Sequence, residues 1–159
     1  MRLFIFFTSL IFSDLLFAAT QTKPVNPDDM VKQFSELHQQ LMPIVAVADM
    51  FYGCHLNKPQ QQQYTLEFLI NDMDKDLLAT NLSDCLGEDN LASDNALNYG
   101  IKACFSDQMS HLPESEQQQN LEQVDTVLAQ LPRAERQKSF TQCVNNQTLK
   151  YLGNSDSNK

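Results

Sequence analysis

The sequence predicts an all-α protein, a single compact bundle of five or six antiparallel helices stapled by two disulfides. Apolar residues recur at three- and four-residue steps along most of the chain, which is the spacing of one helix face. No run alternates apolar and polar residues for long enough to require a strand. An even number of cysteines follows an export-type leader, at Cys54, Cys85, Cys104 and Cys143.

Residues 1–19 have the parts of a secretory signal peptide: Arg2, then a long apolar run, then Ala18-Ala19. The run contains Asp14 and is shorter than the roughly 20 residues that a spanning helix needs. We therefore expect a periplasmic or secreted protein with no membrane attachment after signal removal. Residues 20–27 are polar with two prolines and are predicted to form a flexible leader.

The helical domain is predicted to span residues 28–153, and Asp28 is expected to cap its first helix. An apolar stripe continues along that helix, at Met30, Phe34, Leu37, Leu41, Ile44, Ala48 and Phe51. Pro43 should kink the helix, because proline removes one backbone donor and clashes with the preceding turn. Residues 42–50 are apolar nearly all round, so this segment is either the most deeply buried helix or an exposed docking face.

A second helix is predicted to open at Pro59, followed by a short third helix over residues 81–85 that stops at Gly87. The stripe of the second helix consists of Leu66, Leu69, Ile70, Met73 and Leu77. Ser93, Pro113 and Pro132 are expected at the starts of the fourth, fifth and sixth helices. Gly153 is expected to end the sixth, leaving residues 154–159 as a disordered tail.

Each cysteine has an apolar residue three positions before it, so the cysteines lie on or beside buried stripes. Their wide spacing, with no C-x-x-C pair, argues against a thioredoxin-type centre or a zinc site and favours structural disulfides. All three pairings are open from the sequence. We lean to the sequential one, Cys54 with Cys85 and Cys104 with Cys143, which would staple the two halves separately.

No motif predicts a catalytic group, a metal ligand or a cofactor, and we do not expect an enzyme. Asp72, Asp74 and Asp76 begin like a calcium loop, but Leu77 and Ser83 stand where that loop needs Gly and Glu. We interpret them as a solvated turn, with a weak cation site shared with the next acidic loop as the alternative. The three histidines share no ligand spacing, and there is neither a G-x-S-x-G nor a glycine-rich loop.

The net charge of -9 excludes nucleic-acid binding through a basic face. We expect a non-catalytic extracytoplasmic (periplasmic) protein that binds another protein, such as an inhibitor or an immunity-type protector against a secreted enzyme. A basic enzyme is the partner that the charge favours. The residues expected to contact it are Asp84, Glu88, Asp89 and Asp94. The alternatives are a carrier of a small apolar ligand within the bundle and an enzyme with dispersed acidic catalysts; oligomeric state is left open.

Overall fold

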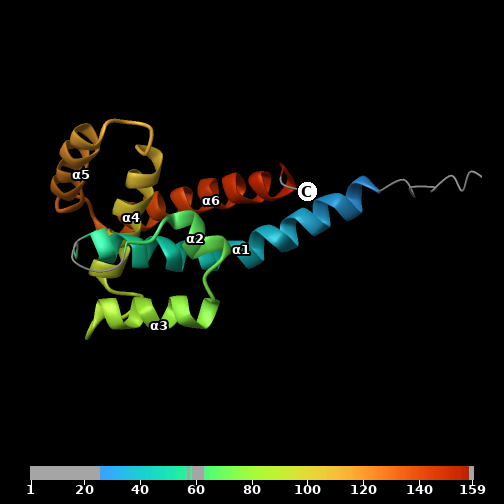
Figure 1. Ribbon diagram of the computed structural model, residues 1–159, viewed down its shortest axis with the longest axis horizontal. Helices are drawn as coiled ribbons and strands as arrows, with labels where there is room; N and C mark the ends of the chain where they lie inside the picture. Colours follow the sequence, from blue (N-terminus) through green and yellow to red (C-terminus); the bar gives the residue numbers. More distant parts are fainter. Residues whose placement is uncertain (1–25, 57, 59–62, 158–159) are drawn as a thin grey trace, which may run out of the picture.

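Helix α1 (Pro27–Leu56) runs through the middle of the fold, and every helix of the described part except the fifth packs against it (Figure 1). The computed structural model describes residues 26–56, 58 and 63–157. Within them it contains no strand and five further helices: α2 (Leu66–Asn71), α3 (Lys75–Leu86), α4 (Asp94–Gln108), α5 (Glu114–Leu128) and α6 (Arg133–Ser157). The all-α prediction is confirmed.

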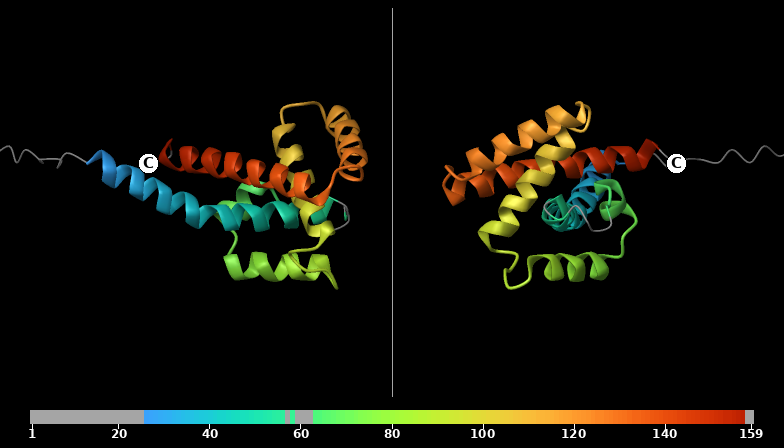
Figure 2. Two further views of the ribbon diagram at one scale, coloured as in Figure 1. Left: turned by 180° about the vertical axis from the view of Figure 1, so that it is seen from behind. Right: turned by 60° about the vertical axis from the view of Figure 1, so that its left-hand side comes forward.

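Helices α3 and α6 lie on opposite sides of α1, with α6 running antiparallel to it (Figures 1 and 2). Helix α5 folds back on α4 at one end of the molecule. The start of α1 and the end of α6 lie together at the opposite end. None of the helices in the described part is long and apolar enough to cross a membrane. The predicted signal peptide and nearly all of the leader lie outside the described residues.

The helix starts predicted at Ser93, Pro113 and Pro132 and the stop predicted at Gly87 are found in the structure. The Ser93 hydroxyl accepts a hydrogen bond from the Ala96 amide, 3.0 Å away, and caps α4. Helices α5 and α6 begin directly after Pro113 and Pro132. Gly87 ends α3 with a φ of 65°, a left-handed conformation that favours glycine.

The second predicted helix is two helices. It breaks at Asp74, whose carboxylate accepts hydrogen bonds from the Asp76 and Leu77 amides at 3.0 Å and so starts α3. The predicted short third helix is therefore the second half of α3. Thr65, not Pro59, precedes α2 as its cap, and Pro59 lies outside the described residues.

Both ends of the predicted helical domain also differ from the structure. The Asn26 side chain accepts from the Asp28 amide at 3.2 Å, so α1 begins one residue before the predicted cap. Helix α6 continues through Gly153 to Ser157, because a single glycine weakens a helix without ending it. Helix α1 stays helical through Pro43 and bends near its middle (Figures 1 and 2).

The core lies between the C-terminal part of α1 and its neighbours. Most of it comes from leucine and other aliphatic side chains of α1, α3 and α4, closed by α2, α6 and the end of α5. The residues with almost no exposed surface include Val45, Ala48, Leu69, Leu78, Leu82, Ala96 and Ile101. One side of the apolar segment 42–50, with Val45 and Ala48, is thus buried centrally, whereas Pro43 on the same segment is exposed.

Two disulfides connect these helices in the sequential pairing that we favoured from the sequence. Cys54 of α1 is joined to Cys85 of α3, with Cα atoms 6.3 Å apart, and Cys104 of α4 to Cys143 of α6, with Cα atoms 6.2 Å apart. The cysteines Cys54, Cys104 and Cys143 are themselves buried. Each bond therefore fixes two helices of the core to one another.

Removing either disulfide should lower the free energy of unfolding by about 3 to 4 kcal/mol, because it frees an unfolded-state loop of 31 or 39 residues. The variants are Cys54→Ala with Cys85→Ala, and Cys104→Ala with Cys143→Ala, compared by urea unfolding. Non-reducing peptide mapping of the parent checks the pairing. A Cys54–Cys104 cross-link in that map would contradict it.

Gly53 is where α1 and α4 approach most closely. A Cβ atom added at Gly53 would collide with the backbone of Tyr99, and one added at Gly100 would collide with the ring of Phe140. The backbone of a packed helix cannot move aside as a flexible side chain can. Glycine at position 53 is therefore required by the helix packing itself.

We expect Gly53→Ala to destabilise the protein by about 3 kcal/mol or more, because overpacking against backbone forces the helices apart. Gly153→Ala is the matched control. It also lies in a helix, but its new Cβ meets no atom within 4 Å, so the change should be neutral or stabilising by up to about 1 kcal/mol. Equal effects of the two substitutions in thermal or urea unfolding would refute the close contact.

Candidate functional site

An apolar groove lies between α4, α5 and the start of α6. Its volume is about 360 Å³; its apolar side chains come from α4, α5 and the segments that follow them, and α6 contributes Ser139. They include Phe105, Met109, Val124, Val127, Leu128 and Leu131. Val127 and Leu131 expose 53% and 37% of their surface, so the groove is open to solvent.

Helix α5 is acidic, although the residues that it contributes to the groove are uncharged. This helix contains Glu114, Glu116, Glu122 and Asp125 and has no Lys or Arg. Asp125 forms an ion pair with Lys102 of α4, with Nζ and Oδ2 2.9 Å apart, which ties the two walls together. Glu116 lies one helical turn before Asn120, which lines the groove. A partner segment bound here would meet apolar side chains beside negative charge.

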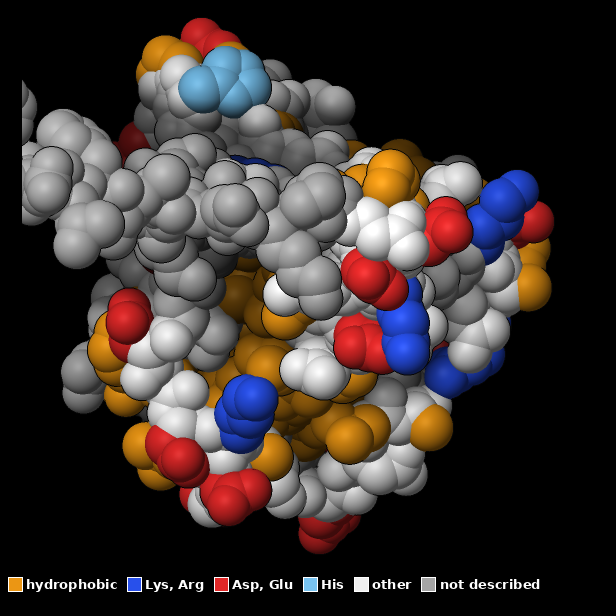
Figure 3. All heavy atoms as spheres, turned by 90° about the vertical axis from the view of Figure 1, so that its right-hand side faces the viewer, with side chains coloured by type: hydrophobic (Ala, Val, Ile, Leu, Met, Phe, Trp, Pro, Cys, Tyr) orange, Lys and Arg blue, Asp and Glu red, His pale blue; other side chains and the backbone are white. Residues whose placement is uncertain are grey.

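A second apolar groove lies at the opposite end of the molecule, between α1 and the end of α6. Its volume is about 490 Å³, and its lining includes Phe34, Leu37, Leu41, Ile44, Leu149 and Leu152. Figure 3 looks onto this end and shows hydrophobic side chains in the centre of the face with charged side chains around them. Beyond the groove, the projecting part of α1 exposes still more apolar surface, with Met30 at 56% and Val31 at 69%.

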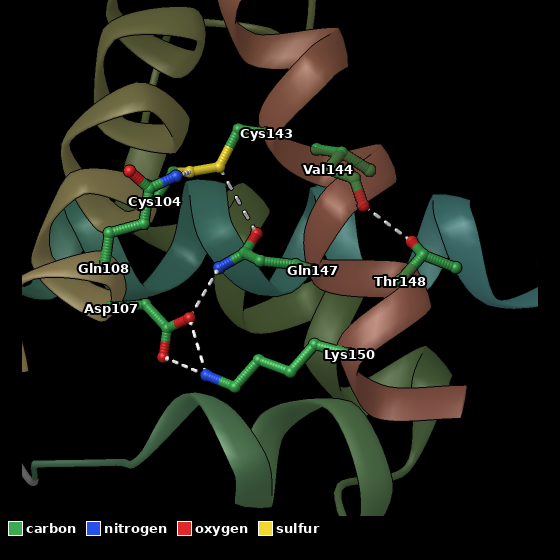
Figure 4. Close-up of a disulfide and its surroundings, with 8 residues drawn as sticks. All are labelled: Cys104, Asp107, Gln108, Cys143, Val144, Gln147, Thr148 and Lys150. Carbon is green, nitrogen blue, oxygen red and sulfur yellow. Dashed lines mark hydrogen bonds and ion pairs between the residues drawn. A yellow bond between two sulfur atoms is a disulfide. The ribbon is translucent and has the colours of Figure 1, made fainter. Parts of the chain in front are cut away.

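A polar cluster lies beside the Cys104–Cys143 disulfide (Figure 4). Lys150 donates from Nζ to both carboxylate oxygens of Asp107, at 3.0 and 3.1 Å, and the Gln147 amide donates to the same carboxylate at 3.5 Å. Gln108 donates to Cys104 Sγ at 3.4 Å. The oxygen of Gln147 lies 3.7 Å from Cys143 Sγ, a contact without a donor because a disulfide sulfur carries no proton. The cluster therefore links α4 to α6 on a single face.

Asp49 of α1 has no exposed surface and lies close enough to Gln147 and Asp107 of this cluster for both to affect its pKa. Neither carboxylate oxygen has a hydrogen-bond partner. Burial raises the pKa of the Asp49 carboxyl well above its usual range; the nearby Gln147 amide opposes this shift, and the charge of Asp107 adds to it. Burial is also the main reason that the pKa of Tyr151 is raised, with Asp107 and Asp49 adding to the effect. The core thus contains a carboxyl group whose neutral form is favoured.

The four acidic residues expected to contact a partner have different surroundings. Asp94 accepts from Arg136 Nη2 at 3.0 Å and also pairs with Arg133, so its charge is used to join α4 to α6. Asp89 accepts from the Asn95 amide at 2.6 Å. Asp84 lines a hollow near His55 and Lys58, and Glu88 is exposed in the loop after α3. Their role in partner binding stays a prediction.

The acidic triplet at the start of α3 acts as a helix start in the structure. Asp74 is the cap of α3, as described above, and Asp76 lies in its first turn. Within the part of the chain that the structure describes, no group of three or more His, Cys, Asp or Glu side chains is arranged to hold a metal ion. The turn that the sequence predicts at these three residues thus holds the cap that starts α3.

Comparisons of the chain with protein-family models, with curated proteins and with solved structures found no match.

Sequence reasoning missed Asp49 and both grooves. A signal for Asp49 was present, since it is the one acid within the apolar segment 42–50. The groove between α4 and α5 has no such signal, because Leu121, Val124, Leu128 and Leu131 form an ordinary helix stripe. Only the packing shows that Val127 and Leu131 stay exposed while Leu128 is covered.

Asp49→Asn should change how stability depends on pH. Above the unfolded-state pKa of about 3.9, unfolding releases the Asp49 proton, so this group lowers the free energy of unfolding as pH rises, until the folded protein also ionises it. The slope is at most about 1.4 kcal/mol per pH unit. Asparagine does not titrate, so it adds no such pH dependence. The free energy of unfolding of Asp49→Asn should therefore rise relative to that of the parent as the pH rises.

The measurement is urea unfolding of parent and variant between about pH 4 and about pH 8. Glu88→Gln is the control because Glu88 is exposed, so it replaces an acid by its amide without changing the core. A difference between parent and Asp49→Asn that does not vary with pH would show that Asp49 ionises as an ordinary surface carboxyl does.

Proposed function

We propose that this chain is a non-catalytic extracytoplasmic protein that binds another protein through the groove between α4 and α5, as an inhibitor or immunity-type protector of a secreted enzyme would. The observation that carries the proposal is the open apolar groove next to the acidic helix α5. Exposed apolar surface of this kind is typical of interaction sites.

The chemistry of the groove defines the partner segment. Phe105, Val127 and Leu131 offer partly exposed apolar surface, which an amphipathic segment can cover with its own apolar face. Helix α5 has four acids and no base, so Lys or Arg on the edge of that segment would be favoured. The net charge of -9 would also speed the encounter with a basic protein.

The scaffold supports this role. Helix α5 packs mainly on α4, and only Leu128 among its residues is buried. The Cys104–Cys143 disulfide fixes α4 to α6 beside the groove, since it lines a hollow that shares Ile101, Phe105 and Ser139 with the groove. The groove is therefore formed before a partner arrives, which reduces the entropy lost on binding.

Val127→Glu should weaken binding of the natural partner at least tenfold, because it places a charge in the apolar groove. Thr126→Glu is the matched control, with the same new side chain on the next exposed position of α5. A photo-crosslinker at position 127 or 126 identifies the partner in the native extracytoplasmic fraction. Titration calorimetry with the purified partner then compares the variants.

The expected result is a partner crosslinked at position 127 but not at 126, with an affinity that falls as salt is added. Its binding should be reduced by Val127→Glu and unchanged by Thr126→Glu. If no other protein is crosslinked at position 127, or if both variants weaken binding equally, the proposal is wrong.

A further inference from the structure

The apolar stripe of α1 has the repeat of a coiled coil. Its residues alternate steps of four and three, at Met30, Phe34, Leu37, Leu41, Ile44, Ala48 and Phe51. The last two are buried by α3, α4 and α6, with Ala48 at 0% and Phe51 at 2% exposure. Met30, Phe34 and Leu37 are 56%, 50% and 47% exposed. One continuous seam is thus packed in its second half and open in its first half.

The open half of the seam leads into the groove between α1 and α6. Leu149 and Leu152 of α6 form the other wall of this groove, and Leu149 is 43% exposed. A seam with the three-four repeat packs best against another helix, whose side chains fit between its own. We therefore expect a helix to bind to this surface.

The charges around the seam favour a second copy of this chain as the source of that helix. The positions that flank the seam carry no Asp, Glu, Lys or Arg in the projecting half: they are Val31, Gln33, His38 and Gln40. The charged residues Asp28, Asp29, Lys32 and Glu36 occupy positions further from the seam. A protein of net charge -9 can approach another copy only where like charges do not meet, and this seam meets that condition.

We infer that two copies associate through the first half of α1, each laying its projecting segment antiparallel into the groove between α1 and α6 of the other. This is a self-complementary contact of the kind found in twofold dimers. An antiparallel arrangement keeps the two helical bodies at opposite ends of the pair. It also brings Asp28 and Asp29 of one copy towards Lys75, which lines the inner end of the groove in the other.

The area involved is sufficient for a reversible dimer. Met30, Val31, Phe34, Leu37 and Leu149 each leave about half of their surface exposed, or roughly 100 Å² apiece. Two copies would then cover about 1,000 Å² of apolar surface, near the lower limit for specific interfaces. The contact lies at the end of the molecule opposite to the groove between α4 and α5 (Figure 1), so it is independent of the proposed partner site.

Sedimentation velocity of the purified, disulfide-bonded protein over a wide concentration range tests the inference. The parent should show a reversible monomer–dimer equilibrium. Phe34→Glu should raise the dimer dissociation constant at least tenfold, because it buries two charges in the seam. Gln39→Glu, on the opposite side of the same helix turn, should leave it unchanged, and so should Val127→Glu.

A cross-linking experiment with Leu37→Cys tests the same inference if Phe34→Glu affects folding. Leu37 lies nearest the twofold axis of an antiparallel pair in which the seam from Met30 to Ile44 faces the same segment of the other copy. Mild oxidation should therefore link two copies through Leu37→Cys and not through Gln39→Cys. A parent that stays monomeric at high concentration, or equal cross-linking at both positions, would overturn the inference. Neither result would bear on Val127 and the proposed partner.

Discussion

The contact between α1 and α4 at Gly53 and Tyr99 is the constraint on which the other helix positions depend. Because no side chain separates the two helices there, α4 crosses α1 close enough for Ile101 and Leu97 to reach the α1 stripe in the core. The neighbouring Cys54 then fixes α3 against α1 on one side. Gly100, next to Tyr99 in sequence, leaves room for the ring of Phe140, so that α6 packs closely against α4.

The same compact centre contains a buried carboxyl group that is energetically unfavourable when it is charged. The Asp49 carboxyl is buried without a hydrogen-bond partner, and such a group destabilises a fold unless it takes up a proton. The residues that affect its pKa, Gln147 and Asp107, lie within about one helical turn of Cys143 and Cys104. The second disulfide thus holds together the two helices that enclose the carboxyl.

The sequence was sufficient for the fold class and for features that depend on local chemistry. Ser93 and Gly87 act at helix ends through their own side chain or backbone, so their roles follow from residue type. The break at Asp74 was missed because the apolar stripe continues through Met73 and Leu77 on both sides of it. The disulfide pairing and the exposure of Phe34 depend on which helices meet, and periodicity shows that a face is apolar without showing what covers it.

That distinction explains why both apolar surfaces are interpreted as interfaces. A helix stripe belongs to the core only as far as neighbouring helices extend along it. Helix α1 has 30 residues, whereas α4, which packs on it most extensively, has 15; the excess length carries the seam from Met30 to Leu37 into solvent. At the other end α5 is covered chiefly by α4, so the side of its stripe at Val127 stays exposed. Exposed apolar surface of this kind is typical of interaction sites. The helix lengths thus account for an exposed apolar surface at each end of the molecule, and these are the two surfaces for which we propose binding.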